Sequence, residues 1–562
     1  MTADPWDEHR FLAVLKDFAP GGTIDASDKR IDANQLARIL EAIPRDAEGR
    51  HLGRAMFKNT YFDGDANFSG VRFRSEAVFD GAEFAGKARF SGAGFDDWAV
   101  FMNATFHNGC DFSEATFAGE AVFSDVRCLG ETRASFDGAR FALDANFNGA
   151  RFWNVQFNTT EFSGRFLSAG AHCARDAWFA NAAFHASVTL GPMIAGRRLV
   201  VDGAIFHEDG QVHASTPELS CIRTRFSGRA DLKLRWAEVV LDDALFLQRS
   251  WITGVQPFPD LDDQWVGSGD ARRSGKEDLP LQERPRLLSM REANVANLAL
   301  SNIDMRACRF AKAQSVDQLR LEADCEFAET PRGRLRTVRR TLAEEHEWRS
   351  QHDRRPGGWH PYECRLPSWV RPAETLNPPE IAALYRSLRK ALEDSKDEPG
   401  AGDFYYGEME MRRQHRSTGL PVAADRRRGI ERAERWIVAM YRSLSGYGLR
   451  ASRALTALML LLVLWTAAFH LYGFQDRVRP YAAKGDLDPP AQIGFPPAPR
   501  EVLAGLGSFE AWTYSAGTAT AIIGAPEAQL TQVGRGLRVS LRILSPLLIG
   551  LALLAIRGRV KR

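Results

Sequence analysis

The sequence is poor in cysteine and in net charge. It has 7 cysteines in 562 residues, and 73 Lys and Arg nearly balance 71 Asp and Glu, for a formal net charge of +2. So few cysteines exclude a small disulfide-stapled scaffold. The balanced charge excludes a protein that binds nucleic acid through bulk positive charge. The first residues contain neither a basic segment nor an apolar run, so we expect no cleaved signal peptide and a cytoplasmic N-terminus.

Catalytic and metal-binding motifs are also lacking. The sequence has no C-x-x-C pair, no G-x-S-x-G and no strand-linked G-x-G-x-x-G. Residues 81–87 resemble a P-loop, but Ala88 stands where a P-loop has Ser or Thr. The spacing of His346, His352 and His360 fits no zinc motif. We therefore expect no catalytic residue, no cofactor and no metal site, and the sequence argues against an enzyme.

Phenylalanine, in contrast, is abundant and regularly spaced. The chain has 35 phenylalanines, many of them in two series with a period of eleven. A return every five or six residues fits neither a helix nor an ordinary strand. It fits a coil with flat sides that each point one Phe inward. The first series is Phe57, Phe68, Phe79, Phe90, Phe101, Phe112 and Phe123; the second is Phe62, Phe73, Phe84, Phe95, Phe106 and Phe117, and its next member would be Cys128.

Small residues separate the phenylalanines and permit tight corners. Gly81-Ala82-Glu83-Phe84 and Gly138-Ala139-Arg140-Phe141 are two examples. This F-x-G-A-x-F pattern resembles the Phe-centred form of the pentapeptide-repeat family. The resemblance implies a right-handed, four-sided β-helix whose core is formed by the two Phe series, with coils stacked about 4.8 Å apart. The mild charge of 57–184 argues against the family's DNA mimicry, so no nucleic-acid partner is expected.

Two further regions follow the Phe repeat. The repeat resumes in aliphatic form near 296–306, after a Gly- and Pro-rich break at 257–285, and we expect it to end near Phe327. Helices are predicted around 6–18 and 34–43, where they would cap the β-helix. Further helices are predicted at 332–351, at 381–392, and at 404–411 with Asp403 as the N-cap. The charged residues Glu408, Glu410, Arg412, Arg413 and His415 are expected to form a salt-bridged helix surface.

Two apolar segments near the C-terminus are predicted to cross a membrane. Residues 454–472 carry no formal charge apart from a possible one at His470, and they are long enough to span a bilayer. The second segment, 537–556, contains Arg538 and Arg542 in its outer turns. Basic residues before the first segment and after the second predict a two-span protein of the inner (cytoplasmic) membrane with both termini in the cytoplasm. Residues 431–444 are predicted to form an interfacial helix.

A short apolar segment with Thr and Gly lies between the two predicted spans. Its pattern Tyr514-Ser515-x-x-Thr518-x-Thr520-x-x-Gly524 resembles the two-span potassium-channel family. The resemblance implies a pore loop at 508–526 and a homo-oligomer that encloses an ion path. The family's Thr-x-Gly-Tyr-Gly-Asp filter is replaced by Ala-Ile-Ile-Gly-Ala-Pro at 521–526, so the resemblance does not extend to potassium selectivity.

Arg535, Arg538 and Arg542 are spaced to share one face of the second predicted span. Two interpretations remain open at this point. The arginines extend to lipid headgroups at the outer interface, or they line an outer vestibule of an oligomer, where their charge would favour anions over cations.

The sequence therefore predicts a multidomain protein: a quadrilateral β-helix, then an α-helical module, then two transmembrane helices. The favoured function is an oligomeric, ion-channel-like pore with a cytoplasmic β-helix that regulates it or binds a protein. The alternative is a membrane-anchored scaffold whose β-helix binds partner proteins without ion conduction. The predicted boundaries are 1–50 for the helical cap, 51–330 for the β-helix with an insertion at about 252–290, 331–430 for the helical module, 431–453 for the interfacial helix and elbow, 454–474 and 537–557 for the spans, 475–536 for the extracytoplasmic or re-entrant segment, and 558–562 for a basic cytoplasmic tail.

Overall fold

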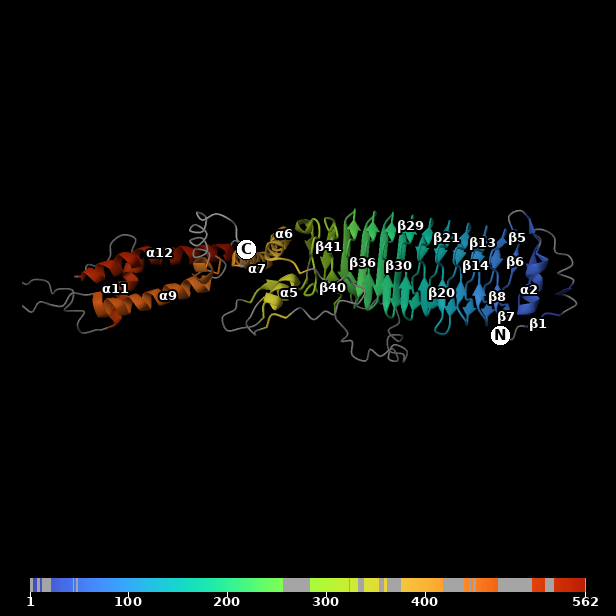
Figure 1. The fold of residues 1–562 in the computed structure, drawn as a ribbon, viewed down its shortest axis with the longest axis horizontal. Coiled ribbons are helices and arrows are strands. Elements are labelled where there is room, and N and C mark those ends of the chain that lie inside the picture. The colour runs from blue at the N-terminus through green and yellow to red at the C-terminus, as the bar shows by residue number, and fades with distance from the viewer. Residues whose placement is uncertain are drawn as a thin grey trace, which may run out of the picture. The chain divides into compact units, whose positions relative to one another are not determined.

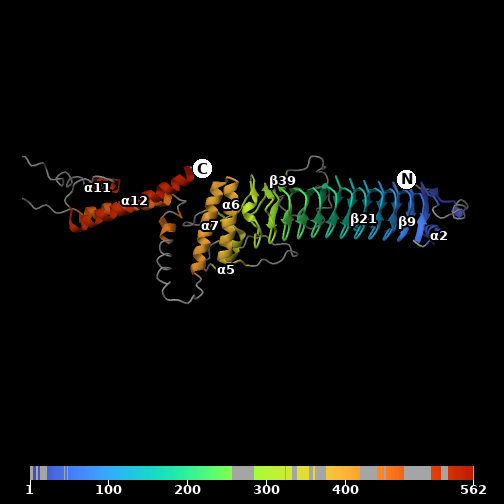
Figure 2. The same ribbon diagram turned by 90° about the horizontal axis from the view of Figure 1, so that it is seen from above.

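The computed structural model describes most of the chain and divides it into two compact units, Met1–Glu408 and Met409–Arg562. The described residues are 4–7, 11–12, 22–43, 45–46, 49–255, 284–322, 324–331, 338–352, 358–360, 375–417, 439–444, 446–447, 451–473, 508–520 and 530–560. The first unit is a solenoid of short parallel strands followed by helices, and the second is helical (Figures 1 and 2).

Four short strands make one coil of the solenoid, one on each side. In the first complete coil these are β6 (Ala55–Met56), β7 (Tyr61–Asp63), β8 (Ala66–Asn67) and β9 (Val71–Phe73), and each pairs in parallel with its counterpart in the next coil. The predicted four-sided β-helix is therefore confirmed. Figures 1 and 2 show the coils stacked from α2 to β41.

The strands of the four sides fall into continuous columns. The first side continues from β2 (Ile24–Asp25) and β6 to β10 (Ala77–Val78), β14 (Ala99–Val100), β18 (Ala121–Val122), β22 (Ala145–Asn146) and β26 (Phe166–Leu167). The second comprises β1 (Asp4–Pro5), β3 (Lys29–Asp32), β7, β11 (Glu83–Phe84), β15 (Thr105–Phe106), β19 (Arg127–Cys128), β23 (Arg151–Phe152) and β27 (His172–Cys173).

The other two sides form a ten-stranded and an eleven-stranded sheet. The ten-stranded sheet contains β8, β12 (Ala88–Arg89), β16 (Cys110–Asp111), β20 (Arg133–Ser135), β24 (Asn154–Gln156), β28 (Asp176–Trp178), β31 (Arg198–Val200), β34 (Glu218–Ser220), β37 (Glu238–Val240) and β40 (Arg286–Ser289). The eleven-stranded sheet contains β4 (Arg45–Asp46), β5 (Gly49–Leu52), β9, β13 (Gly94–Phe95), β17 (Thr116–Phe117), β21 (Arg140–Phe141), β25 (Glu161–Phe162), β29 (Ala183–Phe184), β32 (Ile205–Phe206), β35 (Arg225–Phe226) and β38 (Leu245–Phe246).

All phenylalanines of the two predicted series lie in the solenoid core, each at most 1% exposed. Phe101 stacks on Phe79 and Phe123 of the adjacent coils, with ring centroids 4.8 and 4.9 Å apart. It also meets Phe90 edge-on at 5.3 Å. Cys128 takes the place above Phe106 that the period assigns to it. Two eleven-residue periods of the sequence therefore make one coil of the core.

Glycine and asparagine form the corners, as their conformational freedom requires. Gly81 has a φ of +66°, and Asn59, one coil earlier, also has a positive φ of 52°. A Cβ at Gly81 would lie 2.5 Å from the side-chain oxygen of Asn59. The corner thus combines a left-handed backbone with a close approach between coils, which favours glycine there.

The Phe pattern weakens after Phe184 because the coil changes shape. Two short sides fuse into one strand, β30 (Val188–Ala195), which pairs with both β26 and β27. Phe184 pairs with Phe206, 22 residues away, and Phe206 pairs with Phe226, only 20 residues away. The fused column continues through β33 (Gly210–Ser215), β36 (Ala230–Arg235), β39 (Ser250–Gly254), β41 (Leu298–Ser301) and β42 (Arg320–Leu321).

The ends of the solenoid differ from the predicted boundaries. Strands β2 and β3 already pair with β6 and β7, so the solenoid starts before residue 51 and the first residues are not a purely helical cap. These strands bury Ile rather than Phe, so the Phe pattern did not reveal them. Helix α2 (Ala33–Ala42) lies close to the predicted 34–43, and its N-cap Asp32 forms a capping box with Gln35. The described strands β39 and β40 also extend into the predicted insertion, 252–290; residues 256–283 lie outside the described part.

The region after the solenoid is less helical at its start than predicted. The predicted helix 332–351 is wrong at 340–341, where β44 (Arg340–Thr341) pairs antiparallel with β43 (Ala328–Glu329), and α5 (Ala343–His352) begins after it; residues 332–337 lie outside the described residues. The chain is extended there because β43 offers its edge to β44. A 3₁₀-helix, η1 (Val316–Gln318), and helices α6 (Pro378–Asp394) and α7 (Glu398–Ser417) complete this region.

Helix α7 begins earlier than the sequence indicated. Pro399 lies in its first turn, where proline is tolerated, so residues 399–402, which lie between the predicted helices 381–392 and 404–411, are helical. Asp403 is therefore not the N-cap; its carboxylate accepts a hydrogen bond from the backbone N–H of Arg340, at 3.1 Å.

The second unit contains two helices that are long and apolar enough to cross a membrane, over Ser452–Gly473 and Gln532–Leu553. The first comprises α9 (Ala451–Ala468) and the π-helix η2 (Phe469–Gly473), and the second is part of α12 (Gln532–Val560). Helix α12 thus begins five residues before the predicted 537. Residues 439–444 are helical, and most of the predicted interfacial helix, 431–438, lies outside the described residues.

Candidate functional site

The two apolar helices approach each other closely at one end of a hairpin. The Thr531 hydroxyl donates to the backbone oxygen of Tyr472 at 2.7 Å. A Cβ added to Gly534 would lie 2.2 Å from the backbone oxygen of Gly473. Glycine at 534 therefore permits a backbone contact that any larger residue would prevent.

Trp465 fixes the register of the helices further along. Its Nε1–H donates to the backbone oxygen of Leu537 at 3.0 Å and lies 3.1 Å from the Ser540 hydroxyl. An indole N–H in apolar surroundings needs such a partner. The contact brings Trp465 to the same level as the turn 537–540.

A third helix, α11 (Ser508–Thr520), packs against both members of the hairpin. The Tyr514 ring meets the Phe469 ring edge-on, with centroids 5.2 Å apart. At the other end of α11, the Ser545 hydroxyl donates to the backbone oxygen of Ala519 at 3.0 Å. Helix α11 thus runs from the level of Phe469 to the level of Ser545.

The predicted pore-loop residues lie on α11, apart from Gly524, which is outside the described residues. Tyr514 is 5% exposed, and Ser515 and Thr518 are at most 1% exposed. Among the described residues, no hydrogen-bond partner faces the hydroxyls of Ser515 and Thr518. Thr520 is exposed, and its hydroxyl donates to the Ala516 backbone oxygen at 2.8 Å.

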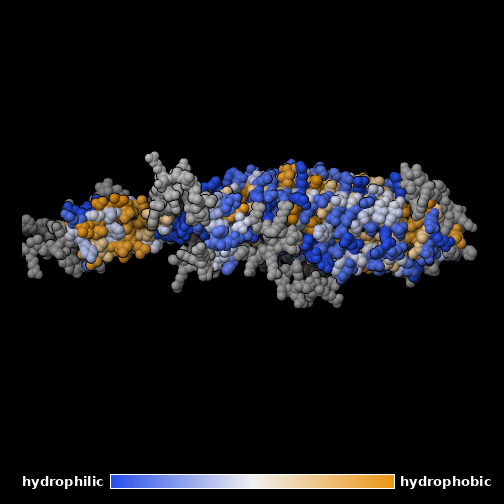
Figure 3. Space-filling view, viewed as in Figure 1, coloured by the Kyte–Doolittle hydropathy of each residue, from blue (hydrophilic) through white to orange (hydrophobic). Residues whose placement is uncertain are grey.

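The three predicted arginines lie on α12 beside its packed face. Arg535 and Arg542 are exposed and Arg538 is half-buried. Leu541 and Ser545, which face α9 and α11, are fully buried. Much of the rest of the exposed hairpin surface is apolar, including Leu464, Leu471, Ile543 and Leu553, and this surface is mainly orange in Figure 3.

Trp465, Thr531 and Ser545 were not predicted as site residues. Each is a lone hydrogen-bonding side chain within or beside an apolar helix, and this feature of the sequence could have identified them.

We expect Gly534→Ala to loosen the hairpin, because the new Cβ would overlap the Gly473 backbone. Gly536→Ala is the matched control: a Cβ there meets nothing within 4 Å, and alanine favours the helix over glycine by about 0.5–1 kcal/mol. The melting temperature of the full chain in detergent should fall for the first variant and stay or rise for the second. Equal melting temperatures for the two variants would contradict the close contact.

Comparison with known proteins identifies the repeat. Residues 57–101 match the family model for pentapeptide repeats (9 copies). The solenoid is built from pentapeptide repeats. Neither the curated proteins nor the solved structures contain a match to this chain.

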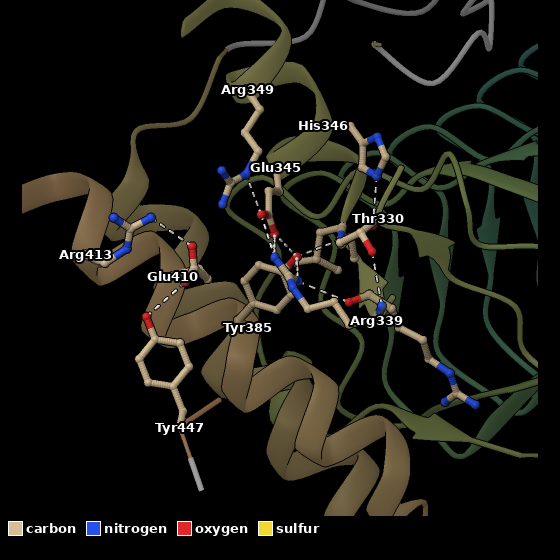
Figure 4. Close-up of polar contacts among 12 residues, drawn as sticks. Thr330, Arg339, Glu345, His346, Arg349, Tyr385, Glu410, Arg413 and Tyr447 are labelled. Carbon is tan, nitrogen blue, oxygen red and sulfur yellow. Dashed lines mark hydrogen bonds and ion pairs between the residues drawn. The ribbon is translucent and has the colours of Figure 1, made fainter. Parts of the chain in front are cut away.

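A buried ion-pair network lies beyond the last coil of the pentapeptide-repeat solenoid (Figure 4). The guanidinium of Arg339 donates two hydrogen bonds to the carboxylate of Glu345, at 2.6 and 2.7 Å, and Arg349 donates a third at 2.7 Å. The Tyr385 hydroxyl also donates to Glu345. Burial would raise the pKa of Glu345, but Arg339 and Arg349 lower this pKa to about 2. The network attaches α5 and α6 to β44.

Glu408 and Glu410 of α7 differ from the predicted helix surface. They are ion-paired as expected, but they are 2% and 4% exposed. Arg386 and Arg389 donate to Glu408 at 3.0 and 3.1 Å. The alternation of charges indicated pairing, but it could not reveal that α6 covers the Glu408 carboxylate.

Glu410 forms a separate cluster within the second unit (Figure 4). Its carboxylate accepts hydrogen bonds from the Tyr447 hydroxyl at 2.9 Å and from Arg413 at 3.1 Å, and Arg442 lies 2.9 Å away. Burial and the adjacent carboxylate raise the pKa of Tyr447. This cluster ties α7 to the turn before α9.

The described residues contain no group of His, Cys, Asp and Glu side chains that could hold a metal ion. An open groove of about 1140 Å³ lies between η1, β42 and α6. Its lining mixes both signs of charge, from residues such as Asp317, Arg320, Glu326 and Lys396. Nothing in this groove resembles a catalytic arrangement.

Proposed function

We propose that this protein forms an oligomeric, ion-conducting pore in the inner membrane, with the pentapeptide-repeat solenoid as a cytoplasmic regulatory or protein-binding module. The observation that carries the proposal is the position of α11. A helix of 13 residues is about 20 Å long, too short for a hydrocarbon core of about 30 Å. It nevertheless packs against both apolar helices, and its end reaches Ser545.

The chain returns to its starting level soon after α11. The backbone N–H of Thr531 donates to the Gly473 oxygen at 3.1 Å, at the same end of the hairpin as Phe469. A segment that enters between two spans and returns to the same side is the layout of a re-entrant pore loop. Backbone away from regular helix is tolerated at membrane depth where it lines a water-filled path. One subunit cannot enclose such a path, so the proposal includes a homo-oligomer.

The buried hydroxyls of Ser515 and Thr518 support the same interpretation. An unpaired hydroxyl in an apolar environment costs free energy. A water molecule or an ion held within this packed face of α11 would satisfy both groups. Tyr514, Ser515, Thr518, Thr520 and Gly524 remain the proposed pore-loop residues.

The proposed orientation places both termini in the cytoplasm. Arg450 precedes α9, Arg453 lies in its first turn, and Arg557 and Arg559 lie near the end of α12, so basic residues flank the same end of the hairpin. Reporter fusions at the two termini should both report the cytoplasm. A reporter outside the cytoplasm at either end would overturn this orientation.

Single-channel recording tests the pore. The purified full chain, reconstituted in a planar bilayer, should give discrete conductance steps. Thr518→Val should change the unitary conductance, because it removes a buried hydroxyl of the proposed pore loop. Thr456→Val is the control, since it removes an exposed hydroxyl of α9 that is bonded within its own helix, and it should leave the conductance unchanged. Inserted protein without conductance would overturn the pore proposal.

One observation favours the scaffold as the second candidate. Several large apolar side chains are exposed on the solenoid, among them Trp98 at 50%, Leu129 at 43% and Leu143 at 50%. An exposed tryptophan is a common anchor of protein interfaces. A chain that inserts without conducting, but binds a protein through the surface around Trp98, would support the scaffold.

A further inference from the structure

The register between α9 and α12 places charge deep in the apolar layer. Ser452–Gly473 is 22 residues long, about 33 Å, which matches a hydrocarbon core of about 30 Å. Trp465 is eight residues from Gly473, about 12 Å along the helix. Since Trp465 contacts Leu537 and Ser540, Arg542 lies slightly deeper still, about 15 Å from that end and close to the middle.

The hairpin itself offers these arginines no counter-charge. Residues 451–473 and 530–560 contain no Asp or Glu. Within the part of the chain that the structure describes, none of Arg535, Arg538 and Arg542 forms an ion pair. A charge near the bilayer middle is costly unless it faces water or a partner. The long arginine side chain can reach an interface from a helix end, but from the middle of the bilayer it must extend much further.

The arginine face is also distinct from the lipid-facing surface. Arg535, Arg538 and Arg542 follow one line along α12, beside Leu541 and Ser545 of the packed face. Ile543, the next residue, is 64% exposed and points to a different side of the helix. One side of α12 is thus suited to lipid and another to water.

We propose that the face formed by Arg535, Arg538 and Arg542 lines a water-filled path that is enclosed by further copies of this chain and binds small inorganic anions such as chloride. This inference rests on the proposed pore and names its substrate class. Three positive charges per subunit, repeated around an oligomer, attract anions and repel cations along the path. The position of Arg542 makes it the deepest charge and the main determinant of selectivity.

Selectivity is tested in a potassium chloride gradient across a planar bilayer. The wild-type reversal potential should indicate that chloride is more permeant than potassium. Arg542→Gln should lower the chloride-to-potassium permeability ratio about 25-fold, because one unit charge about 4 Å from an ion in water favours chloride about fivefold and disfavours potassium about fivefold. Arg542→Lys keeps the charge and should retain the ratio. Cation selectivity of the wild type, or an unchanged ratio in Arg542→Gln, would overturn the proposal.

Water access is tested separately from conduction. Arg542→Cys and Ile543→Cys, each in the full chain in lipid vesicles, are treated with an anionic, membrane-impermeant methanethiosulfonate. The cysteine at 542 should be modified much faster than the one at 543, which faces lipid. Modification at 542 without any conductance would refute the pore but retain the anion-accessible arginine face. Equal protection of both positions would overturn the arginine face itself, whether or not the protein conducts.

Discussion

Replacing Phe95 by Ala should lower the free energy of unfolding by about 3–5 kcal/mol, the usual cost of truncating a buried phenylalanine. Phe95 is 1% exposed and stacks on Phe73 and Phe117, with ring centroids 4.9 and 4.8 Å apart. Its removal opens a cavity that touches three successive coils. Because each coil contacts only its neighbours, the loss should appear first as local unfolding around this site.

Trp98→Ala provides the control for this experiment. Trp98 lies three residues away on the same coil but is 50% exposed, so its loss should cost much less. Chemical unfolding of the full chain in detergent, followed by far-UV circular dichroism, gives the free energies. Hydrogen exchange should be faster for amides of the coils that contain Phe73 and Phe117 in the Phe95 variant only. Similar stability of the two variants would contradict the stacked core.

The position of Phe95 in the core can be predicted because the sequence encodes the solenoid directly. The coils from Phe57 to Phe184 repeat the same local structure, so the period is visible in the sequence without any long-range information. The signal weakened where β30 fused two sides, because the 22-residue coil became a 20-residue coil. The Phe pattern does not extend to the first coil for a different reason: Ala26 and Ile31 stand there where the next coil has Phe57 and Phe62.

The sequence predicts only part of the structure of the hairpin. Its two apolar runs have the length of a membrane span, a property of composition alone. The start of α12 at Gln532, before the apolar run, depends on the contact of Gly534 with Gly473, which lies 61 residues earlier in the chain. Likewise, the level of Arg542 depends on the hydrogen bond from Trp465. Such distant pairings have no periodic signature.

The sequence does not predict the buried network at the end of the solenoid, because charged residues usually lie on the protein surface. Residues 339–349 read as a charged helix, yet Arg339 and Glu345 are at most 3% exposed. Their partner Tyr385 is 40 residues beyond Glu345. Burial of these groups becomes evident only when α6 is placed against β44.

Glu345→Gln should destabilise the solenoid end by about 3–5 kcal/mol, because it leaves the guanidinium of Arg339 buried without its counter-charge. The neighbouring residue supplies a matched control. Glu344 is also buried, and its carboxyl accepts a hydrogen bond from the Phe310 backbone N–H, but burial raises its pKa. A glutamine at 344 keeps that acceptor, and the other carboxyl oxygen of Glu344 has no hydrogen-bond partner among the described residues, so Glu344→Gln should cost less than about 1 kcal/mol.

The variants Glu345→Gln and Glu344→Gln should also differ in how their stability depends on pH. The pKa of Glu345 falls from the ordinary 4.5 to about 2 on folding, so its ion pairs stabilise the protein above pH 4.5 and this contribution is lost as the pH falls toward 2. The contribution amounts to about 3 kcal/mol at neutral pH. Denaturant unfolding followed by tryptophan fluorescence, which reports on Trp348 in α5, should therefore show a smaller loss of stability between pH 4.5 and 2 in Glu345→Gln than in the wild type. Glu344→Gln should retain the wild-type acid dependence over this range. If the two variants follow the same pH curve, Glu345 is not the charged centre of the network.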